Sequence, residues 1–167
     1  MITKGIFNMS DIILTQEQLQ KLVNGVMNGA TVGQAVGISR DTLENLYALG
    51  HGLYTSGNFK DAHVIFQALC IYDSNDYRFW MGLAGSRQAM EDYEKAIDAY
   101  QMAAVATSLR NPEPFLYAAR CLLKLGRKED AIVAIKGLLT LGSKDDPRVV
   151  ACHEKAKALL TLLKAGS

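Results

Sequence analysis

The sequence predicts an all-α protein, an α-α superhelix of three helix pairs with an N-terminal helical segment and a C-terminal capping helix. Three observations carry this prediction. The chain repeats itself with a period of 34–35 residues, which is typical of stacked helix pairs. Helix-start and helix-stop signals flank the repeated segments. Hardly any stretch alternates apolar with polar residues and is rich in β-branched side chains, as a strand would be.

The repeat is seen when residues 43–76 are aligned with 77–110, and a third copy, 112–145, follows a one-residue insertion. Small residues recur where two antiparallel helices would approach closely, and large residues recur where they would fill the gap to the next pair. The small positions are Gly50/Ala84/Ala119 and Ala62/Ala96/Ala131, and the large ones are Leu46/Trp80/Phe115 and Phe66/Tyr100/Ile135. Trp80 is expected to make the largest single contribution to the core.

Capping residues predict where the helices begin and end. Asp41-x-x-Glu44 is expected to be a capping box, Gly57 a left-handed C-terminal cap, and Asn111-Pro112 and Asp146-Pro147 helix starts. The repeat helices are then expected near 42–56, 59–72, 77–89, 93–107, 112–125 and 128–141, with a last helix at 147–164. This divides the chain into an N-terminal segment (1–41), three repeats (42–142) and a C-terminal helix (146–167).

The N-terminal segment is not a fourth repeat. Thr15-x-x-Gln18 is a capping box with Leu14 and Leu19 as an apolar staple, and Met9 offers an alternative start. A second short helix is expected at 31–36, and the glycines at 25, 29, 33 and 37 are interpreted as hinges and caps rather than as membrane helix packing. An apolar stripe exceeds what a solvent-facing helix should show, which predicts weak homodimerisation through this region. The stripe consists of Leu19, Leu22, Val23 and Val26.

Composition and motifs argue against catalysis. The net charge is +1, with five cationic and eight acidic residues in 42–110 but ten and six in 111–167, too weak a basic excess for a nucleic-acid binder. The C-terminal lysines are interpreted mainly as a solvated helix face. The three cysteines and three histidines show no metal-ligand spacing, and no glycine-rich phosphate loop follows a strand. We therefore expect no metal, no cofactor and no apolar run of the about 20 residues that span a membrane.

The repeat resembles the tetratricopeptide repeat, whose 34-residue helix-turn-helix unit is best matched by Trp80-Met81-Gly82-Leu83-Ala84 with Ala96 and Tyr100. Proteins with this repeat bind ligands on a concave surface formed by the first helix of each pair. The resemblance implies that a stripe at i, i+4 and i+7 lines this groove. In the first copy the stripe is Tyr47, His51 and Tyr54; its equivalents are Met81, Gly85 and Gln88, then Leu116, Arg120 and Leu123. Gly85 is expected to leave the backbone open to a ligand.

In its whole organisation the chain resembles the class II chaperones of bacterial type III secretion, over residues 10–162. The segments that carry this resemblance are Asp41-Thr42-Leu43-Glu44-x-Leu46-Tyr47, Phe66-Gln67-Ala68-Leu69-Cys70-x-x-Asp73 and Arg87-Gln88-Ala89-Met90. The third repeat departs most from the family pattern. The resemblance implies a cytosolic, non-enzymatic protein that holds an extended translocator segment, often P-x-L-x-x-P, and keeps hydrophobic pore-forming translocators soluble. It implies no direct contact with nucleic acid or membrane.

The alternative is a generic tetratricopeptide scaffold that joins two folded cytosolic proteins. A clamp for C-terminal carboxylates would require Lys, Arg and Asn along the inner stripe, whereas the first copy offers Tyr47, His51 and Tyr54. The sequence therefore favours an apolar peptide groove over a carboxylate clamp.

Overall fold

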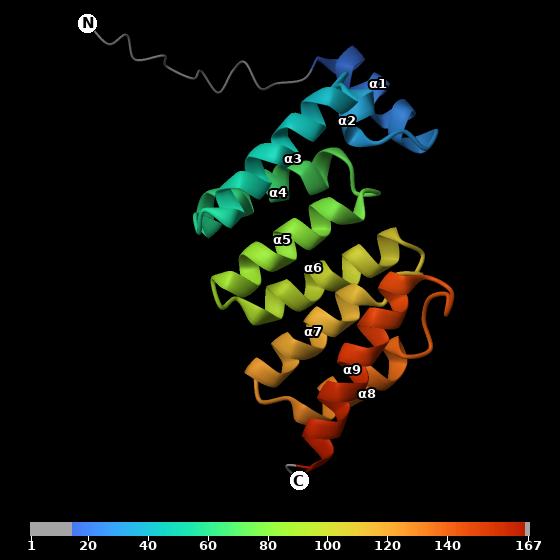
Figure 1. The fold of residues 1–167 in the computed structure, drawn as a ribbon. Coiled ribbons are helices and arrows are strands. Elements are labelled where there is room, and N and C mark those ends of the chain that lie inside the picture. Colours follow the sequence, from blue (N-terminus) through green and yellow to red (C-terminus); the bar gives the residue numbers. More distant parts are fainter. Residues whose placement is uncertain (1–14, 166–167) are drawn as a thin grey trace, which may run out of the picture.

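The computed structural model describes residues 15–165, and these residues form nine helices and no strand, stacked largely in chain order (Figure 1). From α3 to α8, each repeat helix packs against the next one along the chain. The helices are α1 (Gln16–Met27), α2 (Val32–Ala35), α3 (Arg40–Thr55), α4 (Phe59–Tyr72), α5 (Tyr77–Ala89), α6 (Tyr93–Ala106), α7 (Glu113–Lys124), α8 (Lys128–Leu138) and α9 (Pro147–Ala165). The predicted all-α superhelix of helix pairs is confirmed.

The core follows the repeat. All six small positions are buried, and the large positions Phe66, Tyr100 and Ile135 are at most 3% exposed. Phe66 shows why the small residues matter. A methyl group at Gly50 would lie 3.2 Å from the Phe66 ring, and one at Gly82 only 2.3 Å from it. The ring of α4 is thus seated between two glycines of α3 and α5, which sets the spacing of these helices.

Trp80 does not have the place in the core that we expected. It is only partly buried, and its indole N–H donates to the Ser74 carbonyl at 2.9 Å. Its neighbour Phe79 is fully buried instead. One step along a helix turns a side chain by about 100°, so the core-facing aromatic residue is the one before the residue that the repeat pattern highlights.

The turns between paired helices share one backbone conformation. Gly57 and Gly126 have φ values of 83° and 75°, as the predicted left-handed caps require. Glu91 takes the equivalent position in the second copy with φ of 63°, a conformation that costs a residue with a side chain about 1 kcal/mol or more. The shape of the turn is therefore kept even where the sequence lacks glycine.

Two helices begin at different residues from those expected. Ser39 caps α3, accepting a hydrogen bond from the Thr42 amide, so Asp41 lies in the first turn rather than at the cap. Glu44 is used in ion pairs instead of in a capping box. Helix α7 begins one residue late, with Pro112 at the cap position and Asn111 accepting from the Glu113 amide.

The N-terminal helix α1 lies at one end of the stack and packs mainly on α2 (Figure 1). It has the predicted capping box of Thr15 and Gln18 but no buried residue; Leu14 lies outside the described residues. Gly29 and Gly37 take positive φ, as caps do. Gly25 and Gly33 differ from the expectation, because they are close-packing positions where a methyl group would lie 3.1 Å from Ala35 and from the Tyr72 carbonyl.

The C-terminal helix α9 closes the other end of the stack. It buries Val149, Cys152 and Ala156 and contacts α7 and α8. Its start follows the predicted Asp146-Pro147 signal, with Asp146 accepting from the Arg148 amide. Among residues 15–165, no helix is long and apolar enough to cross a membrane.

Candidate functional site

The first helices of the repeats, together with Phe66 of α4 and Tyr100 of α6, line a cavity of about 320 Å³ that is open to solvent. Five of the predicted groove residues line it together: Tyr47, His51 and Tyr54 from α3, and Met81 and Gly85 from α5. The helical offsets i, i+4 and i+7 explain the set from α3, because they place the three rings on one face. The cavity is therefore walled on one side by an aromatic stripe and on the other by small and flexible side chains.

The aromatic wall is fixed by contacts from beneath. The Tyr47 ring centroid lies 6.0 Å from that of Phe66, edge to face, and 5.9 Å from that of Phe79. The His51 ring follows at 6.3 Å from Tyr47. Because Phe66 and Phe79 are buried, they hold Tyr47 in one orientation. A ligand would meet a preformed surface, which lowers the entropy cost of binding.

We expected Gly85 to leave the backbone open to a ligand, but the structure differs. The Tyr54 ring lies across it, so that a methyl group at Gly85 would be 3.4 Å from the ring. Tyr54 also packs edge to face on Phe59, with centroids 5.3 Å apart. The glycine thus makes room for a tyrosine of the neighbouring helix, and Tyr54 forms the wall of the cavity there.

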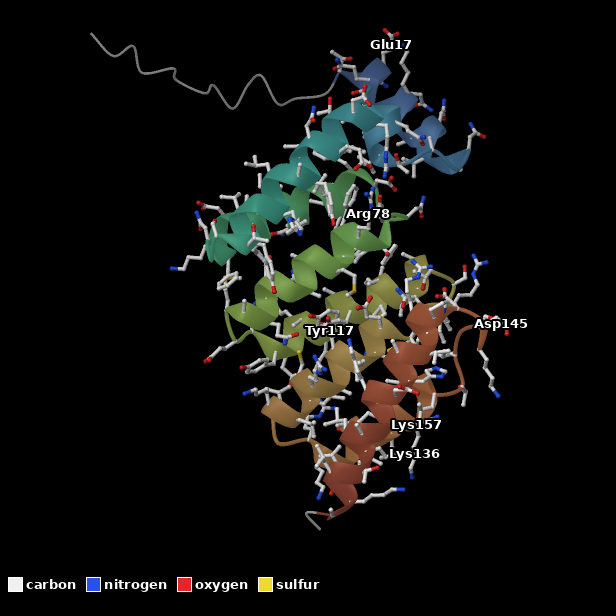
Figure 2. The ribbon with its side chains drawn as sticks, viewed as in Figure 1. Glu17, Arg78, Tyr117, Lys136, Asp145 and Lys157 are labelled. Carbon is white, nitrogen blue, oxygen red and sulfur yellow. The ribbon has the colours of Figure 1, made fainter. Side chains whose placement is uncertain are left out.

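Arg78 joins the cavity to a charged network at the start of α5. Its guanidinium lies 4.9 Å from the Tyr47 ring centroid, close enough for a cation–π contact. The same group pairs with Glu44 at 2.7 Å and with Asp76 at 2.7 Å, and Arg40 bonds Asp76 from the other side. Glu44 and Arg78 are equivalent positions of successive repeats, so the ion pair fixes the register of α3 on α5 (Figure 2 labels Arg78).

The network keeps its carboxylates ionised. The hydrogen bond from Arg78 lowers the pKa of Glu44. Burial alone would raise the pKa of Asp76, but hydrogen bonds from Arg78 and Arg40 outweigh this effect and hold it below its ordinary value. Asp76 also accepts from the Arg78 amide at the N-terminus of α5. These charges position Tyr47 and the first turn of α5 at the edge of the cavity.

Four predicted groove residues lie elsewhere, and one of them, Leu123, lines neither this cavity nor its neighbour. Gln88 does not line the cavity; its side-chain carbonyl accepts from the Tyr100 hydroxyl at 2.7 Å and faces the Cys121 thiol. Leu116 and Arg120 line a second, larger cavity of about 560 Å³ next to the first. Leu116 is only 3% exposed, so it forms the floor of that second cavity.

Sequence reasoning missed seven residues that line the aromatic cavity: Phe66, Tyr77, Arg78, Gly82, Tyr100, Glu113 and Tyr117. The repeat alignment holds the signal that would have found Tyr117, which is labelled on α7 in Figure 2. Tyr117 is the equivalent of Gly82, as Tyr100 is of Phe66. Where Phe66 lies against Gly82 in one copy, Tyr100 stacks on Tyr117 in the next, with ring centroids 5.5 Å apart. The groove stripe is therefore one residue wider than the spacing i, i+4, i+7.

The predicted dimerisation residues lie on α1, which does not line this cavity. Leu19, Val23 and Val26 are each between 43% and 50% exposed, Met27 is more exposed still, and Leu22 is partly buried. Helix α1 thus presents an apolar stripe that the described residues cover only in part.

The chemistry of the site is that of binding. Among the described residues, no three His, Cys, Asp or Glu side chains gather to hold a metal ion. The cysteines are buried and free, and burial raises the pKa of the Cys70 thiol to about 12 and that of Cys121 to about 11. Such thiols are protonated at neutral pH and therefore weak nucleophiles.

Comparisons with known proteins agree with this geometry. The tetratricopeptide repeat family matches residues 47–111 and 86–146. Low calcium response locus protein H of Yersinia pestis is 41% identical over 117 residues, which cover 70% of this chain and 69% of that protein.

Solved structures extend the likeness to about four fifths of the chain. The type III secretion translocator chaperone SycD of Yersinia enterocolitica is 36% identical with a TM-score of 0.74, covering 80% of this chain and 98% of that one. SycD has also been solved as an alternative dimer, with a TM-score of 0.71 over 96% of SycD. A further structure holds a peptide of the translocator YopD, with a TM-score of 0.70 over 97% of SycD. Both are 37% identical to this chain and cover 77% of it.

PcrH of Pseudomonas aeruginosa has been solved with the chaperone binding region of PopD. It is 37% identical with a TM-score of 0.71, over 77% of this chain and 96% of PcrH. The repeats and the aromatic cavity thus occur in a chain whose sequence and fold are similar to those of translocator chaperones. The chain belongs to the tetratricopeptide-repeat family of type III secretion translocator chaperones.

Proposed function

We propose that this protein binds an extended segment of a hydrophobic, pore-forming translocator in the aromatic cavity and keeps that translocator soluble and competent for secretion. The observation that carries the proposal is the cavity itself, in which Tyr47, His51, Tyr54 and Met81 from two successive repeats face one space. Proteins of this family are chaperones and not enzymes, which agrees with a site built from rings and a thioether.

The dimensions and surface of the cavity suit an extended peptide. First helices of neighbouring repeats lie about 10 Å apart, and an extended chain advances about 3.3 Å per residue. Six residues, the length of a P-x-L-x-x-P segment, therefore cross two to three helices. Tyrosine rings provide apolar area for proline and leucine, and their hydroxyls offer hydrogen bonds to a peptide backbone. YopD and PopD segments bound to SycD and PcrH support the same class of ligand here.

The proposal includes the bacterial cytoplasm as the compartment and a homodimer as the resting state. A pore-forming protein exposes long apolar segments before it reaches its membrane, and these would aggregate without a partner. The uncovered apolar stripe of α1 supports self-association, as does the solved alternative dimer of SycD.

Co-expression with a translocator from the same operon tests the proposal. We expect the translocator to be insoluble alone and soluble with this chain. Gly85→Leu would place a side chain beside Tyr54 and fill the cavity, so the translocator should again be insoluble. The matched control is Gly137→Leu on α8, where a side chain meets nothing within 4 Å.

Two outcomes would contradict the proposal. One is a translocator whose solubility is the same with and without this chain. The other is a Gly85→Leu variant that is folded, as judged by helix content, and that solubilises the translocator as well as the control does.

A further inference from the structure

The second cavity, of about 560 Å³, is continuous in its lining with the aromatic cavity. Tyr77, Glu113 and Tyr117 line both. It lies where α5 begins and α6 ends, between α7 and α9. A chain that leaves the aromatic cavity past Tyr117 would therefore reach the second cavity next.

The second cavity is rich in cations. Arg110, Arg120, Arg148 and Lys155 line it, against the carboxylates of Glu113 and Asp146. Arg148 is paired with Asp146 at 3.1 Å, so that these two charges offset each other. Within the part of the chain that the structure describes, Arg110, Arg120 and Lys155 lie beyond ion-pair distance of any carboxylate. Three unpaired cations thus face one space in which Glu113 is the remaining carboxylate.

Arg120 is held in a position suited to recognise an anion. Its guanidinium lies 5.4 Å from the Tyr117 ring centroid, which supports one face of the group. A guanidinium held by its face keeps its N–H groups free at the edge for a carboxylate. Leu116 and Cys152, at 3% and 6% exposure, form an apolar floor beneath. An ion pair beside such a floor is screened less than one in open solvent.

We propose that this basic cavity binds an acidic side chain of the same translocator segment whose apolar part occupies the aromatic cavity. The inference rests on the proposed function and adds an electrostatic requirement to it. Because the two cavities are about one repeat apart, roughly 10 Å, the acidic residue lies about three residues beyond the apolar anchor. Chaperone and translocator would then be matched by charge as well as by the apolar motif.

Synthetic peptides and isothermal titration calorimetry test the inference. The probes share a P-x-L-x-x-P core with alanine at the x positions. Two of them carry a pair of glutamates about three residues before or after the core, because the peptide has two possible directions, and their partners carry glutamines instead. We expect one glutamate peptide to bind about five- to tenfold more tightly than its glutamine partner. This advantage should shrink when NaCl is raised from about 0.05 M to about 0.5 M.

The protein variants assign the effect to the cavity. Lys155→Gln should lose most of the preference for glutamate and leave the affinity for the glutamine peptide unchanged. Lys157→Gln is the matched control, because Lys157 is exposed on the same helix (labelled in Figure 2) and does not line the cavity. Arg120→Gln should also lose most of the preference for glutamate; because Arg120 supports the Tyr117 ring, the quantity compared is the ratio of the glutamate to the glutamine affinity, with circular dichroism showing unchanged helix content.

The outcomes separate the two proposals. Equal affinity for the glutamate and glutamine peptides in both directions overturns the electrostatic inference and leaves the proposed function standing. A glutamate preference that Lys155→Gln and Arg120→Gln leave intact also overturns it, because residues outside this cavity would then bind the glutamate. Failure of every peptide to bind contradicts the proposed function, and the inference with it.

Discussion

At the scale of single residues, the seating of Phe66 between Gly50 and Gly82 controls the distance between the first two repeats. We predict that Gly82→Ala destabilises the protein by about 2–3 kcal/mol, because the new methyl group would overlap the Phe66 ring, which is 2% exposed and would have to shift. Thermal or urea unfolding measures this change.

Gly85→Ala on the same helix is the matched control. Its methyl group would meet the Tyr54 ring at 3.4 Å, an ordinary contact, and alanine favours a helix over glycine by about 0.5–1 kcal/mol. Gly85→Ala should therefore be neutral or slightly stabilising. Equal stability of the two variants would show that Phe66 does not need the space at Gly82.

The charged network around Arg78 predicts a pH dependence. The pKa values of Glu44 and Asp76 lie below their ordinary values near 4 in the folded chain. Their contribution to stability is therefore fully present above about pH 4.5, and is lost as the pH falls through the folded pKa values. Arg78→Gln removes one of the two arginines that pair with both carboxylates, leaving Arg40, and also removes the cation–π contact with Tyr47.

We expect the variant to melt about 2–4 °C below the parent at pH 7. The difference should narrow as the pH is lowered from 5 to about 3, where the carboxylates are protonated in both proteins. Thermal melts by circular dichroism across this range measure it. A gap that stays constant down to about pH 3 would mean that the ion pairs do not stabilise the fold.

At the scale of elements, α1 stands out because it packs mainly on α2 and little on the repeats. Its apolar stripe is only partly covered by the described residues, and the proposed dimer would bury the rest. We predict that Leu19→Glu with Val23→Glu converts the dimer to a monomer, because charges at a buried apolar interface would lose their hydration. Sedimentation velocity at several protein concentrations measures the change.

The control introduces glutamates on the opposite side of α1, as Lys21→Glu with Asn24→Glu. These residues are exposed and lie about 100° or more around the helix from every residue of the stripe. This variant should remain dimeric. If both variants sediment like the parent, self-association does not use the α1 stripe.

At the scale of the whole molecule, the 34-residue period was enough to predict the fold. Small residues such as Ala62, Ala96 and Ala131 are all fully buried, because two helices can approach closely only where side chains are short. The repeat does not specify how far each helix is rotated about its axis. That rotation depends on contacts between helices, such as Phe66 against Gly82 and Glu44 with Arg78.

The errors at the site follow from this rotation. Gln88 was placed in the groove by its spacing, yet it turns toward Tyr100 and Cys121. Tyr117 was overlooked, although it stands where the second repeat has Gly82, and it lines both cavities. The spacing of residues along a helix identifies those that share one face. Which side chains border a cavity also depends on how the neighbouring helices pack against that face.

The central claim, that the aromatic cavity holds the translocator segment, is tested most directly by calorimetry with a P-x-L-x-x-P peptide. The variant is His51→Ala with Tyr54→Ala, two exposed residues that line the cavity. The control is Asn45→Ala with Leu49→Ala, two exposed residues of the same helix that do not line it. We predict that the first pair weakens binding by about 2–4 kcal/mol, while the control keeps the parent's affinity and both keep their helix content. Unchanged affinity in the folded His51→Ala, Tyr54→Ala variant would contradict the claim and place the peptide on another surface.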